Sequence, residues 1–432
     1  MTEPDVVAGP RPRETHRREP GAAALVAALV VSAFFVAFGA LHYGFYTRDL
    51  LKDTPIYERY GDAIVHDRKV PYRDFAVEYP PAALPVFAAP SLAAEKGDFS
   101  RYSALFELLM LLCGAAAAAL VGRILVAQGA GLPRLVAGTL LAGLAPLALG
   151  PVVLSRFDLW PAALTIAALA ALAIGRHRLG FGVLGVAIAA KIYPAVLLPL
   201  LGAYVWRRTG RRQAAIGVGI VAAAVAACLV PFLVLAPSGV WESLSGQAGR
   251  PLQIESLGAS LLLAAHQAWG LALREVSSHG SDNLAGTAPD VLAAAQSVAG
   301  IALLLGIWVA FAREEGSRDR LLRYAAAAIC AFVVLSKVLS PQYLVWLMAL
   351  VPLVRGRRGL VAGACSSRQW CSLSSGSRTG TSSSSTRSTD GRPGSCWRGT
   401  SSSWRCSSRC CGPRGGLRAP AWPSSARPSL RL

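Results

Sequence analysis

The sequence predicts an all-α, polytopic transmembrane protein of about 8–10 membrane segments with a long first extracytoplasmic loop. Of its 432 residues, 53% are hydrophobic and only 16% charged, whereas soluble domains have about 45–50% apolar and about 25% charged residues. Apolar runs of about twenty residues, long enough to cross a bilayer, recur along most of the chain. Arginines cluster between these runs, where the positive-inside rule places them. The net charge of +19 therefore does not indicate nucleic-acid binding.

The N-terminal segment, residues 1–20, is polar and ends in Arg17 and Arg18, which predicts a cytoplasmic N-terminus. The first apolar run, residues 22–43, is too long for the apolar core of a secretory signal peptide and is expected to be a membrane anchor. The polar stretch 44–80 follows, with six basic and seven acidic residues. It therefore forms the first extracytoplasmic loop.

Further spans are expected where apolar runs lie between arginine clusters. They cover residues 102–122, 135–153, 159–175, 180–206, 214–236, 290–312, 321–340 and 343–354. With every arginine cluster in the cytoplasm, the turn 156–158, the large region 237–289 and the tip near Pro341 face the outside. Whether the proline-rich residues 79–95 cross the membrane or only dip into it stays open, and the arginine pattern favours a dip or a tilted entry.

Residues 180–206 begin and end beside arginines that belong on one side. We expect this segment to enter the membrane and return as two short halves, with the turn at Lys191 and Pro194. The alternative is one tilted helix with a snorkelling lysine. The G-x-G-x-x-G pattern of Gly180–Gly185 has no strand before it, so it indicates close helix packing rather than a nucleotide site.

The end of the chain, residues 363–432, differs in composition from the rest. Residues 366–432 contain twenty serines, eleven arginines and one acidic residue, Asp390. Out-of-frame reading of a GC-rich gene gives this mixture, so we expect a frameshift near codon 365; a natural disordered basic tail is the alternative. Four tail cysteines have a spacing that fits no usual zinc site: Cys396, Cys406, Cys410 and Cys411. The predicted domains are a polar N-terminus (1–20), a transmembrane domain (21–362) and this tail (363–432).

The first outer loop carries the candidate general base. Pro55 suits the first helical position, with Asp53 or Thr54 as the cap. An apolar face then predicts a helix on the membrane surface, formed by Ile56, Tyr60, Ala63 and Ile64. Asp53 would lie at the positive end of the helix dipole, which favours an ionised carboxylate able to accept a proton. The alternative is that Asp53 only caps the helix.

A second set of polar residues lies in or beside the spans. Ionisable groups there are costly and usually mark function. The set comprises Arg156, Asp158, Lys191, Arg250, Gln253, Glu255, Lys337 and Gln342. Several cations near the outer leaflet indicate an anionic headgroup such as a phosphate. Each cation alone has a structural alternative, as an interfacial anchor or in an ion pair, and Arg156 has Asp158 two residues away.

Six short motifs occur in order along the chain. They are Asp53-x-x-x-Tyr57-x-x-Tyr60-Gly61, Val70-Pro-Tyr-Arg-Asp-Phe with Glu78-Tyr79-Pro-Pro, Arg156-Phe-Asp158, Ala190-Lys191-Ile-Tyr-Pro194, Arg250-Pro-Leu-Gln-Ile-Glu255 and Ser340-Pro-Gln-Tyr343. Over about residues 21–360 this set resembles glycosyltransferase family 87, which comprises bacterial membrane enzymes of the GT-C class, including actinobacterial mannosyl- and arabinofuranosyltransferases. The resemblance implies a GT-C-like fold, a polyprenyl-phosphate sugar donor and an essential acid in the first outer loop, here Asp53 with Asp49 as the fallback.

The function expected from these features is glycosyl transfer at the bacterial plasma membrane. A mannose or another hexose or pentose would pass, with inversion, from a polyprenyl-phosphate sugar to an envelope glycolipid or glycan on the extracytoplasmic side. Tyr57, Glu78 and Tyr79 would join the donor-binding set. No metal site and no cofactor beyond the lipid-linked sugar is expected, although a divalent metal stays open. The alternatives are a lipid or solute transporter and an inactive, truncated family member. The expected partners are the bilayer, the donor and the acceptor, without nucleic acid, and the oligomeric state stays open.

Overall fold

The computed structural model describes residues 20–44, 53–314 and 316–356. Asp49, most of the N-terminal segment and the tail from residue 363 lie outside this range. The predictions of a frameshift, of a disordered tail and of an unusual cysteine cluster therefore stay predictions.

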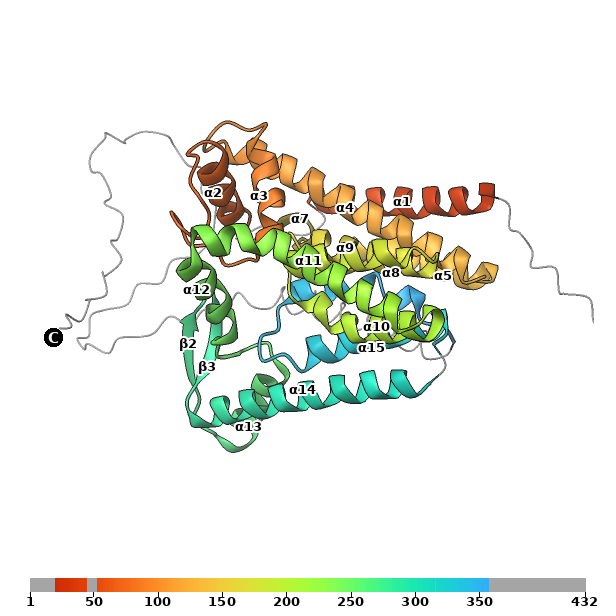
Figure 1. The fold of residues 1–432 in the computed structure, drawn as a ribbon. Helices are drawn as coiled ribbons and strands as arrows, with labels where there is room; N and C mark the ends of the chain where they lie inside the picture. The colour runs from red at the N-terminus through yellow and green to blue at the C-terminus, as the bar shows by residue number, and fades with distance from the viewer. Residues whose placement is uncertain (1–19, 45–52, 315, 357–432) are drawn as a thin grey trace, which may run out of the picture. The chain divides into compact units, whose positions relative to one another are not determined.

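Four helices in the described part are long and apolar enough to cross a membrane (Figure 1). They are α1 (Pro20–His42), α4 (Phe99–Ala127), α11 (Arg211–Leu235) and α14 (Thr287–Arg313). Shorter apolar helices pack among them, including α5 (Leu132–Gly143), α8 (Leu159–Ala173) and α9 (His177–Ala190). The predicted fold class, a helical membrane protein, is confirmed. The number of crossings stays a prediction.

Arginine-rich segments gather at one end of the bundle. Gly122, near the end of α4, lies against Val26, near the start of α1. The Arg207 guanidinium, at the end of α10 (Leu198–Thr209), binds the carbonyl of Ala312 at the end of α14. The sorting of polar segments between two ends therefore agrees with the arginine pattern, and the side of the membrane that each end faces stays a prediction.

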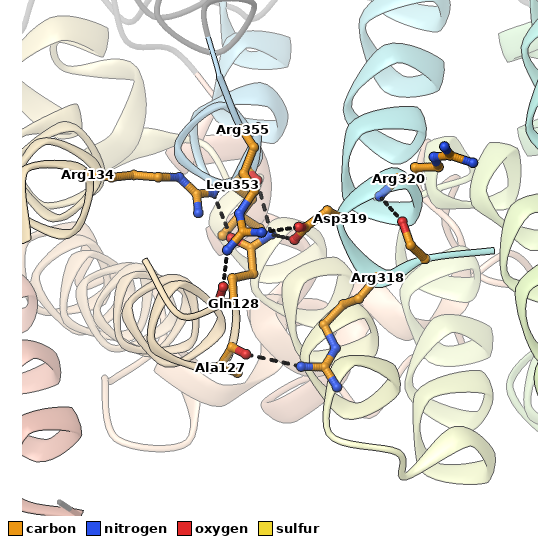
Figure 2. Close-up of polar contacts among 9 residues, drawn as sticks. Ala127, Gln128, Arg134, Arg318, Asp319, Arg320, Leu353 and Arg355 are labelled. Atoms are coloured by element: carbon orange, nitrogen blue, oxygen red, sulfur yellow. Dashed lines mark hydrogen bonds and ion pairs between the residues drawn. The ribbon is translucent and has the colours of Figure 1, made fainter. Parts of the chain in front are cut away.

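A polar network ties several helix ends together at the arginine end (Figure 2). The Gln128 amide, just after α4, donates to Asp319 Oδ1 at 3.0 Å and to the Leu353 carbonyl at 3.3 Å. Arg134, in α5, donates to Gln128 Oε1 at 2.7 Å. Arg355 pairs with Asp319 and also binds the Gln128 carbonyl. The network joins the ends of α4 and α5 to α15 (Arg318–Val334) and to the short helix η4 (Val351–Leu353).

The segment 180–206 folds back on itself, as predicted. Helix α9 ends where Lys191 adopts an extended conformation, with φ −159° and ψ 136°. The chain then forms the short helix η2 (Tyr193–Leu197) and α10. The His177 ring at the start of α9 lies 6.3 Å from the Tyr204 ring near the end of α10. Both ends of the segment therefore lie together, and a single tilted helix is excluded.

The glycines of the G-x-G-x-x-G pattern serve helix packing, as expected. A Cβ atom at Gly180 would lie 1.9 Å from Leu172 Cδ1 of α8, and one at Gly185 would lie 2.6 Å from Ala224 Cβ of α11. Neighbouring helices therefore approach α9 more closely than any side chain there would allow.

Three predicted spans are broken or shorter in the structure. Residues 135–153 form α5, α6 (Ala145–Leu149) and α7 (Val152–Ser155), because Pro146, Gly150 and Pro151 interrupt the helix. Residues 321–340 form α15 only as far as Val334. Residues 343–354 form η3 (Pro341–Tyr343), α16 (Leu344–Met348) and η4.

The other end of the bundle carries α2 (Thr54–Val65), η1 (Pro81–Ala83), α3 (Leu84–Ser91), α12 (Pro237–Ala248) and α13 (Leu257–Trp269). Helix α3 spans about 12 Å, too short to cross a bilayer core of about 30 Å, so residues 79–95 do not cross it as a helix. Three strands also lie here, β1 (Leu252–Gln253), β2 (Arg274–Ser278) and β3 (Ser281–Ala285), in an antiparallel sheet ordered β1-β3-β2. The all-α prediction missed this sheet.

Candidate active site

Asp53 stands immediately before α2 and has an ionic partner. Pro55 occupies the first turn, as expected, but the Asp53 side chain makes no capping hydrogen bond. Its carboxylate pairs with Arg156 instead, and Tyr57 Oη lies 3.5 Å from Asp53 Oδ2. The Asp53 side chain is 15% exposed and that of Arg156 25%. The capping alternative is therefore wrong for the side chain, and so is the alternative that Arg156 simply pairs with Asp158.

Asp158 begins α8 and pairs with Lys191 at the break after α9. Lys191 Nζ lies 2.6 Å from Asp158 Oδ1, and the Trp346 indole donates to the same oxygen at 2.7 Å. Asp158 is fully buried. Its second oxygen, Oδ2, has no hydrogen-bond partner among the described residues. This oxygen keeps an unused acceptor position inside the protein.

Aromatic rings surround the Lys191 ammonium. The ring centroids of Phe157, Trp346 and Tyr343 lie 4.8, 5.1 and 5.6 Å from Lys191 Nζ. Trp346 stacks between Tyr193, at 3.9 Å, and Tyr343, at 4.2 Å. Cation–π contacts of this kind hold a lysine ammonium away from bulk water. Sequence reasoning missed Trp346 and Tyr193 as site residues, although both lie in or beside the motifs that define the family resemblance.

The first outer loop supplies a buried tyrosine pair. Tyr57 is fully buried and stacks on Phe87 with ring centroids 4.5 Å apart. Its hydroxyl lies 3.5 Å from that of Tyr79. Burial raises the pKa of both Tyr57 and Tyr79, so both phenols stay protonated at neutral pH. Both tyrosines therefore stay uncharged, and Tyr57 contacts Asp53 directly.

The face of α2 that is fully buried is not the predicted apolar one. Ile56, Tyr60, Ala63 and Ile64 are only partly buried. The fully buried positions are Thr54, Tyr57, Gly61 and Asp62. Gly61 lies so close to α3 that a Cβ atom would sit 2.4 Å from the Phe87 carbonyl. Helix α2 therefore packs on protein through its tyrosine–glycine face.

The predicted cations do not all converge. Arg156 and Arg250 lie near enough to Lys191 to act on its charge. Arg250 also donates to Ser281 Oγ at 2.9 Å and to the His279 carbonyl at 3.3 Å. By contrast, the Lys337 ammonium binds the Ala248 carbonyl at 2.8 Å. Three of the four predicted cations therefore form the electrostatic environment of the site, and Lys337 fastens α12.

The remaining predicted residues have different surroundings. Gln253 and Gln342 each have a buried side-chain oxygen without a hydrogen-bond partner among the described residues. Glu255 is exposed. Glu78 is exposed and borders a separate groove between the first loop and α12. In the described ranges, no group of three or more His, Cys, Asp or Glu side chains is placed to hold a metal ion.

The sequence was compared with models of known protein families, and it matches one of them. A family model described as glycosyltransferase family 87 matches residues 77–341. The chain belongs to glycosyltransferase family 87. The matched range contains Arg156, Asp158, Lys191 and Arg250, while Asp53 precedes it. The role of Asp53 in this family 87 protein therefore does not rest on the family match.

A solved structure is also similar to this family 87 protein. It is a crystal structure of ArnT from Cupriavidus metallidurans bound to undecaprenyl phosphate, with 17% sequence identity and a TM-score of 0.46. The similarity covers 84% of this chain and 66% of that chain, so this chain spans just under two thirds of that protein. No protein of curated function matches this chain.

Proposed function

We propose that this protein transfers a sugar from a polyprenyl-phosphate donor to an envelope glycolipid or glycan at the extracytoplasmic face. One observation carries the proposal: in a family 87 membrane protein, the Asp53–Arg156 and Asp158–Lys191 pairs lie at the end of the bundle opposite the arginine clusters. A carboxylate that can accept a proton and cations that can hold a phosphate are therefore both present.

The cations would act on the departing phosphate. A polyprenyl-phosphate sugar is a phosphate diester, and loss of the sugar leaves a monoester with more negative charge. Lys191, Arg156 and Arg250 supply positive charge where this negative charge develops. The rings around Lys191 keep water from its ammonium, which strengthens the electrostatic interaction.

Asp53 would act on the acceptor. As the acceptor hydroxyl attacks the anomeric carbon, its proton passes to the Asp53 carboxylate. A new carbon–oxygen bond forms while the bond from the anomeric carbon to the phosphate oxygen breaks on the opposite face, and the configuration inverts. Arg156 holds the Asp53 carboxylate in place through their ion pair. The sugar is a mannose or another hexose or pentose.

The variant Asp53→Asn tests this role. It keeps the size of the side chain but removes the base, so transfer of labelled sugar from polyprenyl phosphate should fall by about 100-fold or more. The matched control is Asp67→Asn in the same loop, because among the described residues Asp67 forms ion pairs with Lys96 and Lys69 alone. Transfer by Asp53→Asn at the wild-type rate, with equal expression, would rule out the assignment.

A transporter is the competing class, and one feature favours it. Two segments, residues 177–209 and 318–355, begin and end at the arginine end, and transporters often contain paired broken helices. Formation of a glycosidic bond by vesicles given a set of polyprenyl-phosphate sugars would decide for the enzyme. Counterflow of the lipid or sugar without any product would decide for the transporter.

A further inference from the structure

A cavity that is separate from the candidate active site is present in the structure. It has a volume of about 350 Å³ and lies between residues 72–78 of the first loop, one face of α12 and the hairpin tip at His279. We call it the α12 groove. Its polar lining consists of Arg73, Asp74, Glu78, Glu242, Ser243, Gln247 and His279. Its volume lies within the range of small-molecule sites, about 300–1,000 Å³.

The groove is acidic, unlike the cation-rich site. Arg73 binds Asp74 through two hydrogen bonds, of 2.9 and 3.1 Å, so these two charges cancel. Glu78 and Glu242 have no basic partner within ion-pair distance among the described residues. With His279 neutral, the lining carries a net charge of −2. An anionic donor phosphate is therefore disfavoured here.

The lining matches an uncharged polyol. Ionised carboxylates accept hydrogen bonds from hydroxyl groups and form stronger bonds than neutral acceptors do. Ser243 and Gln247 add one hydroxyl and one amide. Tyr72 and Phe75 contribute ring surface, which suits the apolar face of a sugar ring.

Contacts connect the wall of the groove to the candidate active site. Glu78 is followed by Tyr79, whose hydroxyl meets that of Tyr57 beside Asp53. Gln247 Nε2 lies 3.4 Å from the Glu78 carbonyl, and Arg250 lies 3.5 Å from Gln247 Oε1. The groove wall is therefore linked to Asp53 through Tyr79 and Tyr57, and to Arg250 through Gln247.

The groove wall is also fixed in shape. Tyr72 adopts φ +68°, which is unusual for a residue other than glycine. Its carbonyl packs against Gly239 at the start of α12, where a Cβ atom would lie 1.9 Å away. The first loop and the start of α12 are therefore in close backbone contact at the cavity.

We propose that the α12 groove binds neutral sugar units of the acceptor and directs one hydroxyl toward Asp53. This proposal rests on the proposed transferase function and adds the chemistry of the acceptor: an uncharged glycan rather than a phosphate or an amine. The acidic lining then keeps the anionic donor out of the acceptor's place.

The test uses the purified full chain in detergent, with Glu242→Gln and Ser243→Ala. Neutral octyl disaccharides serve as lipid-tailed acceptors, and the matching free disaccharides report direct binding by saturation-transfer NMR. We expect Glu242→Gln to raise the acceptor KM at least fivefold and to weaken free-disaccharide binding equally. Donor KM and slow donor hydrolysis without acceptor should stay within twofold of wild type. Binding of the octyl disaccharides without any binding of the free disaccharides would assign recognition to the lipid tail. That result would overturn the proposal.

The control variant is Glu95→Gln, an exposed acid outside the groove, which should leave every value unchanged. Normal donor hydrolysis with unchanged acceptor KM and disaccharide binding in both groove variants would overturn the proposal. Stronger binding of amino sugars than of neutral ones would do so as well. If the wild type bound neutral disaccharides in a Glu242-dependent way but neither transferred nor hydrolysed any donor, the transferase function would fail and the glycan site would stand.

Discussion

Arg156 and Asp158 stand two residues apart, yet each pairs with a distant residue, Asp53 and Lys191 respectively. Arg156 is still extended, whereas Asp158 already has helical backbone angles at the start of α8, so their side chains diverge. Residue type and motif were sufficient to identify all four as site candidates. Their partners were not predictable, because pairing depends on where α2 and the break at Lys191 lie in space.

The buried Asp158–Lys191 pair should make a large contribution to the free energy of unfolding. In Lys191→Met, the Asp158 carboxylate would keep only the Trp346 indole, at 2.7 Å, and an uncompensated buried charge costs about 3–5 kcal/mol. We expect a corresponding loss in the free energy of unfolding, measured by chemical denaturation of the full chain in micelles.

The double variant Lys191→Met with Asp158→Asn provides the control. Because it removes both charges, it should regain most of the lost stability while transfer stays abolished. A single variant as stable as the wild type would mean that the charges do not meet in the folded protein.

At the scale of elements, the helices were predictable where one apolar run was uninterrupted. The run 102–122 became α4 with a few more residues at each end. The sheet was not predictable, since β2 is almost wholly exposed and has no alternating apolar pattern. Its hairpin turns through His279 and Gly280, both with positive φ, and histidine is a weaker turn signal than asparagine or aspartate.

Helix contacts formed through glycine should be sensitive to one added methyl group. In Gly185→Ala, the new Cβ would meet Ala224 Cβ at 2.6 Å and the Val221 carbonyl at 2.9 Å, so α9 and α11 must separate. We expect a loss of about 1–3 kcal/mol, seen as a lower Tm in micelles. In α10, Gly202 has no atom within 4 Å of its Cβ position, so Gly202→Ala should be neutral or stabilising. Equal effects of the two variants would contradict the close packing of α9.

At the scale of the whole molecule, the arginine pattern predicted which segments share an end of the bundle. The pattern was sufficient because it follows one physical rule that acts on every loop. It did not predict the network around Gln128, Asp319 and Arg355 (Figure 2). In this network, backbone carbonyl groups accept several of the hydrogen bonds that the arginines donate.

Cysteine labelling tests the predicted orientation of the protein in the membrane. In a chain with its native cysteines replaced by serine, a membrane-impermeant maleimide should label Glu275→Cys, in β2, in intact cells. It should label Arg212→Cys, at the start of α11, only after permeabilisation. Reversed labelling would place Asp53 and Lys191 on the cytosolic side and contradict the proposed extracytoplasmic reaction.

Helices α8 and α9 have 15 and 14 residues, so each rises only about 21–22 Å from the arginine end before it stops at Asp158 or Lys191. The hydrocarbon layer is about 30 Å thick. If the arginine end lies at one membrane surface, the charged groups lie below the opposite lipid surface. For the proposed reaction, a prenyl-linked headgroup would then reach them by moving sideways and slightly inward from the leaflet. The donor would not have to leave the bilayer for water, and the sugar would be transferred at membrane depth.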